Sequence, residues 1–180
     1  MNRPIDSEYA NYFRGYIDQV SETDVMAVLR SELDDLDVLL DRVPADKETY
    51  AYDAGKWTIR QVVGHLIDGE RVFGYRALCI ARGETQNLPG FEQDDYLQTS
   101  PYNHMDLEDL LSELRLVRLS NIAMFRSLDG AAWDRVGTAN NNQVSVRALA
   151  FIMAGHLRHH MNVLREKYLN YDSPQASLSA

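Results

Sequence analysis

Four long segments of the sequence repeat apolar residues with the period of an α-helix, at about residues 22–42, 58–82, 106–128 and 145–168. In the first segment one face carries Val25, Leu29, Leu33, Leu36 and Leu40. Each helix would be roughly 30 to 37 Å long at ~1.5 Å per residue, so the four match well enough in length to pack together. The sequence therefore predicts an all-α fold, a four-helix bundle with long crossover loops.

Residues at the starts of these segments are typical of helix caps. Thr58 precedes the second segment, and Gln61 follows three residues later, as in a capping box. Asp106 and Ser145 stand where the third and fourth helices should begin. A shorter helix is expected at about residues 6–18.

The connections between the predicted helices are irregular. Residues 83–105 contain two glycines and two prolines and show no clear element of their own, and a connection this long usually crosses a bundle or covers a site. Residues 129–144 form a second polar connection, and no stretch of the chain has the alternating pattern of a strand. We expect one domain over residues 1–170, followed by a weakly ordered tail at 171–180.

Composition and charge restrict the partners of the chain. Eighteen Lys and Arg against 27 Asp and Glu give a net charge of −9, which argues against nucleic acid or an anionic membrane. No apolar run reaches the ~20 residues of a membrane span, and the N-terminus lacks the apolar core of a signal peptide. The single cysteine, Cys79, is expected to be a small buried hydrophobe. Together these features predict a cytoplasmic protein.

Three of the five histidines fall within residues 156–160. On the fourth segment, His156 and His160 complete an apolar face that otherwise consists of Leu149, Ile152, Met153, Val163 and Leu164. A buried imidazole without a partner would lose roughly 1 to 3 kcal/mol of solvation. The i, i+4 spacing lets both rings reach a single metal ion, which would satisfy them. A hydrogen-bonded pair and a solvent-exposed face are the alternatives.

His65 is the candidate for a third ligand. It lies seven residues after the start of the second segment, and His160 lies eight before the end of the fourth. Each is therefore ~11 or 12 Å into its helix, and the two meet at one level if the helices run antiparallel. His159 is expected to flank the site or face solvent, and His104 to pack or cap beside a helix start.

Glu70 interrupts the apolar face of the second segment. Because a buried carboxylate is rarely left unpaired, it is expected to orient a ligand histidine, to pair with Arg71 or Arg76, or to face solvent through a gap. The ion pair is the favoured interpretation. The nearby aromatic residues are expected to pack at the end of the bundle: Tyr50, Tyr52 and Trp57.

The stretches "YAYDAGKWTIRQVVGHLIDGERVFGYRALCIARGE" and "GTANNNQVSVRALAFIMAGHLRHHMNVLREKYL" resemble the DinB-like superfamily, and the resemblance extends over roughly residues 20–170. The most specific elements are the single histidine after "KWTI", the "LPGF" loop and the terminal "GHLRHH". This resemblance implies a four-helix bundle of unusual connectivity, often a homodimer, with a divalent metal held at His65, His156 and His160. The sequence departs from the family pattern at none of the three.

Some members of the superfamily are similar to bacillithiol transferases and mycothiol-dependent enzymes. The resemblance therefore favours an S-transferase in which the metal activates a low-molecular-weight thiol for attack on an electrophilic small-molecule substrate, since three imidazoles leave the coordination sphere unfilled. Water in the open position would instead make a hydrolase, with Glu70 as a conceivable catalytic base. A third alternative is a non-catalytic, stress-related dimeric binding protein stabilised by the metal. Zinc or nickel is favoured as the metal, with iron as an alternative.

Overall fold

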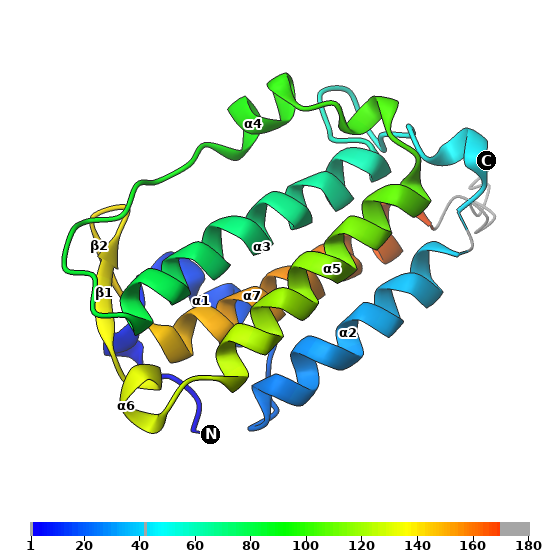
Figure 1. Cartoon of the computed structure of the whole chain (residues 1–180). Helices are drawn as coiled ribbons and strands as arrows, with labels where there is room; N and C mark the ends of the chain where they lie inside the picture. Colours follow the sequence, from blue (N-terminus) through cyan, green and yellow to red (C-terminus); the bar gives the residue numbers. More distant parts are fainter. Residues whose placement is uncertain (1, 42, 170–180) are drawn as a thin grey trace, which may run out of the picture.

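The structure is a computed structural model that describes residues 2–41 and 43–169 (Figure 1). Four long helices form the predicted bundle: α2 (Val25–Leu40), α3 (Ile59–Ala81), α5 (Leu107–Arg126) and α7 (Val146–Val163). Both α3 and α2 pack against both α5 and α7. Helices α2 and α3, which follow one another among the long helices, thus lie at opposite corners of the bundle. The predicted tail at 171–180 lies outside the described residues.

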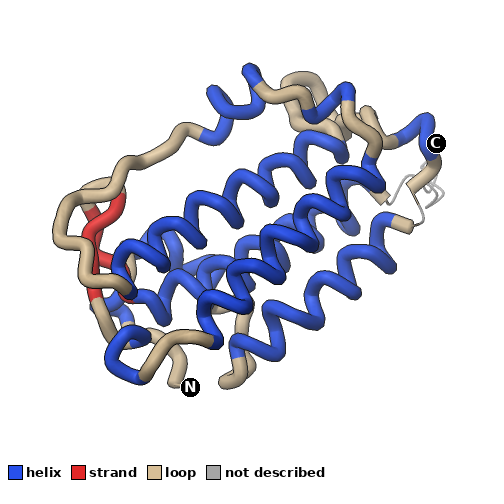
Figure 2. Tube along the Cα trace, in the orientation of Figure 1, coloured by secondary structure: helices blue, strands red, loops and turns tan. Residues whose placement is uncertain are grey.

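The direction of the helices explains the long connections. Figure 1 shows α3 and α5 running the same way and α7 running opposite to α3. Two parallel neighbours cannot be joined by a short turn, so the chain between α3 and α5 must return along the bundle. Figure 2 shows this connection passing from the end of α3 back to the other end of the molecule. The antiparallel arrangement of α3 and α7 is the one that the histidine positions required.

The predicted starts of α3 and α7 are confirmed. Thr58 Oγ1 accepts a hydrogen bond from the Gln61 backbone nitrogen at 3.1 Å, and Gln61 Oε1 accepts one from the Thr58 backbone at 2.9 Å. Ser145 Oγ accepts from the backbone nitrogen of Ala148 at 2.9 Å. Asp106 occupies the N-cap position of α5, but its side chain makes no capping hydrogen bond. A π-helical turn, Leu164–Tyr168, continues α7.

The helix predicted at residues 6–18 is broken. The structure has two 3₁₀ turns, Asp6–Glu8 and Asn11–Phe13, followed by the one-turn helix α1 (Arg14–Ile17). Glu8 is held by contacts to the start of α7, because its carboxylate accepts from Ser145 Oγ at 2.6 Å and from Arg147 Nη2 at 2.9 Å. These tertiary contacts outweigh the local helical pattern.

The polar connection at 129–144 contains structure that the sequence analysis missed. A short helix, α6 (Gly130–Trp133), precedes an antiparallel hairpin of β1 (Val136–Ala139) and β2 (Asn142–Ser145). Asn140 and Asn141 form its turn with φ of 49° and 60°, the positive values that a two-residue hairpin needs and that asparagine tolerates. The expectation of no strand is wrong for this hairpin, although the fold remains a helical bundle.

The connection at 83–105 also has elements of its own, contrary to expectation. Leu88 forms a bridge to Ala139 of the hairpin. Further along lie α4 (Gln93–Thr99) and a 3₁₀ turn, Tyr102–His104. Cys79 is free and half-buried rather than fully buried. None of the described helices combines the length and apolar character needed to cross a membrane.

A polar layer divides the apolar core into two parts. One part gathers the beginnings of α2 and α7 with the end of α3, and the other gathers the opposite ends of these helices. Between them the four long helices bury charged and polar side chains: Glu32, Glu70, Arg118 and His156. The candidate site thus lies in the middle of the bundle, where a well-packed apolar layer would otherwise be expected.

Candidate metal centre

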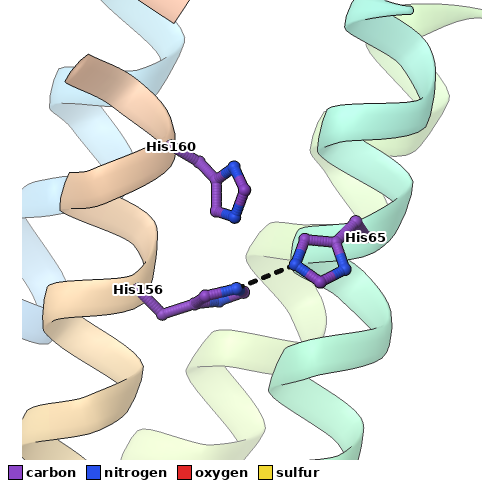
Figure 3. A group of neighbouring side chains, drawn as sticks. All are labelled: His65, His156 and His160. Carbon is purple, nitrogen blue, oxygen red and sulfur yellow. Dashed lines mark hydrogen bonds between the residues drawn. The ribbon is translucent and has the colours of Figure 1, made fainter. Parts of the chain in front are cut away.

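Three imidazoles meet between α3 and α7. His65 comes from α3, and His156 and His160 come from successive turns of α7, so that the rings point toward one another (Figure 3). The possible ligand nitrogens all lie within 4.8 Å of one another, and the Nε2 atoms of His65 and His156 are 2.9 Å apart. All three residues are buried. The structure therefore brings together the set of histidines that the sequence analysis selected.

The protein satisfies these rings only in part, since His65 and His156 are hydrogen-bonded to each other through their Nε2 atoms. Nδ1 of His160 is buried and has no hydrogen-bond partner among the described residues. An unsatisfied buried nitrogen costs free energy, but Figure 3 shows that His160 turns its other ring nitrogen toward His65 and His156. The converging nitrogens are the ones placed to bind a metal, and divalent metal ions bind imidazole readily. The donor set fits a divalent ion of the zinc, nickel or iron type, and three ligands would leave room for a further one.

Burial keeps the three imidazoles neutral. It lowers the pKa of His65 to about 4, against an ordinary value near 6.5. Burial also lowers the pKa values of His156 and His160 well below that value, and repulsion between the neighbouring rings acts in the same direction. Neutral imidazole is the form that binds a metal, so the cluster needs no deprotonation at neutral pH.

Aromatic side chains surround the cluster. The ring centroid of Trp57 lies 4.8 Å from that of His65, and the Tyr16 and Phe73 centroids lie 5.3 and 5.7 Å from that of His156. Trp57 packs at the bundle end as predicted, and its ring also reaches the site, which the prediction did not include. The tyrosines do pack at that end, against Tyr168: Tyr50 and Tyr52. The place of Trp57, directly before the cap of the His65 helix, is the signal that could have revealed it.

Two pockets open from the cluster. One has a volume of about 320 Å³ and is lined by His65 and His156, and the other has a volume of about 440 Å³ and is lined by His160. Gln93 and Asp94, at the start of α4, line both pockets. The connection at 83–105 thus covers the site, as predicted for a loop of this length.

A hydrogen bond fastens this cover to the bundle. Asp94 Oδ1 accepts from Trp57 Nε1 at 3.1 Å. The Asp94 carboxylate also counteracts, in part, the effect of burial on the pKa of His65. Sequence reasoning did not select Asp94, because nothing in its local pattern relates it to a histidine 29 residues earlier.

Glu70 forms the predicted ion pair, but with a different arginine. Its Oε1 lies 2.8 Å from Nη2 of Arg118 on α5, and its Oε2 accepts from Asn121 Nδ2 at 3.0 Å. Arg71 instead pairs with Glu113. With both oxygens engaged, and with no place in the lining of either pocket, Glu70 gains no support as a catalytic base. That role stays a prediction.

The other two histidines lie where the sequence placed them. His159 is half-buried, with its ring centroid 5.0 Å from that of His160, and it lines the larger pocket beside the cluster. His104 is exposed in the 3₁₀ turn before α5. Neither belongs to the group of three convergent nitrogens.

The fold and site define a helical bundle built around a buried cluster of three histidines. Residues 29–164 match the sequence pattern of the DinB superfamily, and the chain belongs to this superfamily. Among solved structures it is similar to YfiT from Bacillus subtilis, described as a probable metal-dependent hydrolase with an unusual four-helix bundle topology. The two chains share 18% sequence identity with a TM-score of 0.70, over 91% of this chain and 89% of YfiT, a likeness that concerns the fold. Comparison with curated proteins gave no match.

Proposed function

We propose that this protein holds one divalent metal ion with His65, His156 and His160 and is a thiol-dependent S-transferase acting on an electrophilic small molecule. The observation that carries the proposal is the convergence of three buried, neutral imidazoles beside two pockets. When bound, the ion supplies a positive charge that lowers the pKa of a coordinated thiol. The thiol sulfur would form a bond to an electrophilic carbon, whose leaving group would depart with the bonding electrons, and the thiol proton would pass to solvent.

The residues around the cluster support this chemistry. Trp57, Tyr16 and Phe73 place apolar ring surface next to the histidines, which excludes water and suits an organic substrate. A thiol ionises on coordination and needs no separate base. The engagement of Glu70 with Arg118 and Asn121 therefore counts in favour of the transferase over a hydrolase that depends on Glu70.

Hydrolysis is the second candidate, and two observations favour it. YfiT, which shares the fold, is described as a probable metal-dependent hydrolase. In addition, Asp94 lines both pockets and could take a proton from an attacking water in place of Glu70.

Metal content and thiol dependence test the proposal together. We expect His65→Ala, His156→Ala and His160→Ala each to lose most of the bound metal in elemental analysis, and His159→Ala, the adjacent control, to retain it. The metal-loaded protein should then couple a low-molecular-weight thiol to chlorodinitrobenzene, with an absorbance change that needs both thiol and metal.

Each alternative has its own outcome. Unchanged metal content in all three variants would contradict the metal centre. Turnover of a nitrophenyl ester that is indifferent to added thiol would favour the hydrolase. A chelator that lowers the melting temperature of a protein without turnover of either probe would favour the non-catalytic alternative.

A further inference from the structure

Arg76 is a buried cation without an anionic partner. Its residue is only 5% exposed, yet no acidic side chain of residues 2–41 and 43–169 forms an ion pair with it within 4.0 Å. Its Nη2 donates to the Pro89 carbonyl at 2.7 Å, and its guanidinium carbon lies 6.0 Å from the centroid of the Phe73 ring. Nε is buried without any hydrogen-bond partner among these residues. The described part of the chain thus supplies a hydrogen-bond acceptor to only one nitrogen of this guanidinium, Nη2.

The second deeply buried arginine shows what is missing. Arg118 is 0% exposed, and its Nε likewise has no hydrogen-bond partner among the described residues, but its guanidinium lies between two carboxylates, with Glu70 at 2.8 Å and Glu32 at 3.5 Å. A buried charge is costly unless it is paired, and Arg118 meets that condition within the chain. Arg76 does not, and burial lowers its pKa as a result. An anion from outside the chain would supply the missing partner.

Arg76 lies in the same pocket as the histidine cluster. His65, His156 and Arg76 all line the 320 Å³ pocket, and Arg76 lies further along α3 than His65. His65, Gly69, Phe73 and Arg76 follow one another at spacings of four, four and three residues, which places them on one face of the helix. Eleven residues correspond to ~16 Å along the axis. The Phe73 ring spans part of this distance, since its centroid lies 6.0 Å from the guanidinium carbon of Arg76 and 5.7 Å from the His156 ring centroid. A single small molecule can therefore contact both groups.

The other residues that line this pocket limit the charge of a ligand that could bind in it. Glu92 and Asp94 also line the pocket, so a dianionic phosphate would meet two carboxylates and a single arginine. A carboxylate carries one charge and matches the planar fork of a guanidinium. The remaining walls are largely aromatic and suit an apolar body next to the carboxylate: Tyr12, Phe13, Phe73 and Phe91.

We propose that Arg76 binds the carboxylate of the substrate and holds an apolar or aromatic body against these walls, with the reactive end toward the histidines. This inference deepens the proposed function, since it names the substrate class of the same site. Arg76 acts here as a specificity-determining residue.

Binding of three matched pairs of probes to the metal-loaded protein tests the inference. Phenylacetate, 3-phenylpropionate and 4-phenylbutyrate, each with its neutral amide, are titrated by calorimetry. The wild type is expected to bind at least one carboxylate ten or more times more tightly than its amide, and Arg76→Met to lose this preference. Arg71→Met, which removes an exposed arginine of the same helix, should behave as wild type.

Several outcomes would overturn the inference. These are the absence of a carboxylate preference in the wild type for all three acids, its persistence in Arg76→Met, and tighter binding of inorganic phosphate than of the carboxylates. If Arg76→Met does not fold, Arg76→Lys replaces it. This variant keeps the charge but not the planar fork, and at least threefold weaker carboxylate binding is expected.

The two proposals fail in different ways. Arg76→Met is expected to retain the metal that His156→Ala loses. A carboxylate preference that depends on Arg76 but appears in a protein that binds no metal would support the subsite and contradict the metal centre. Metal binding without any effect of Arg76 on carboxylate affinity would support the metal centre and contradict the subsite.

Discussion

The burial of His65 makes the stability of the metal-free protein depend on pH. In the folded chain the pKa of His65 is about 4, whereas an unperturbed histidine titrates near 6.5. Between these values the unfolded chain binds a proton that the folded chain does not, so stability falls as the pH is lowered. His156 and His160 act in the same direction.

We expect the free energy of unfolding of the metal-free protein to fall between pH 6.5 and about 4, with His65 contributing about 3 kcal/mol. Urea denaturation in the presence of a chelator measures this. His65→Leu should have a clearly weaker pH dependence, because the buried titrating group is gone. His104→Leu, a change at an exposed histidine, serves as control and should keep the wild-type dependence. Equal slopes in the wild type and His65→Leu would contradict the prediction.

The close contact between helices α1 and α7 depends on Gly155, the residue before His156. A Cβ atom on Gly155 of α7 would lie only 2.0 Å from the backbone carbonyl oxygen of Tyr16, so α1 approaches α7 more closely than any side chain allows. The Tyr16 ring in turn contacts His156 edge-on. Gly155 thereby sets the position of one wall of the site.

Gly155→Ala is expected to destabilise the protein by about 1 to 3 kcal/mol, because backbone atoms of α1 must move to admit the methyl group. Gly15→Ala within α1 is the matched control, since a Cβ atom there meets nothing within 4 Å. Thermal unfolding of the two variants makes the comparison. If Gly155→Ala were as stable as Gly15→Ala, the close contact between α1 and α7 would be refuted.

At the scale of the whole molecule, the polar layer connects the four long helices through a single buried arginine. Arg118 of α5 reaches Glu32 on α2, Glu70 on α3 and the carbonyl oxygen of Met153 on α7. Burial raises the pKa of Glu32 to about 7, although Arg118 and Arg158 both act to lower it. One cation thus contacts all the other long helices of the bundle.

The homodimer that the family resemblance implies stays a prediction.

Arg118→Met should cost about 3 to 5 kcal/mol, because it leaves two buried carboxylates without this cation. Arg115→Met is the control on the same helix. Arg115 forms ion pairs with Asp34 and Asp37 near the surface, and its loss should cost less than about 1 kcal/mol. Chemical denaturation distinguishes the two, and equal losses of stability would rule out a special role for the polar layer.

The local sequence pattern was sufficient to predict the long helices and the three clustered histidines. Periodicity records which face of a helix is buried, and the caps at Thr58 and Ser145 record where two of the helices begin. His156 and His160 are detectable because they occupy an apolar face four residues apart. The depth of His65 within its own helix then relates it to them, provided that the two helices are antiparallel. All of this information lies within single helices.

Only the tertiary structure decided what faces the cluster. A pattern shows that a residue is buried but not against what, so the pairing of Glu70 with Arg118, 48 positions away, could not be read from either helix. The same holds for Asp94 and for the pocket that Arg76 shares with His65 and His156, because both depend on the connection at 83–105, which returns along the bundle. The sequence by itself therefore determined the four long helices and the three histidines. Packing between distant segments decided the pocket, because contacts across the bundle leave no periodic signal in the chain.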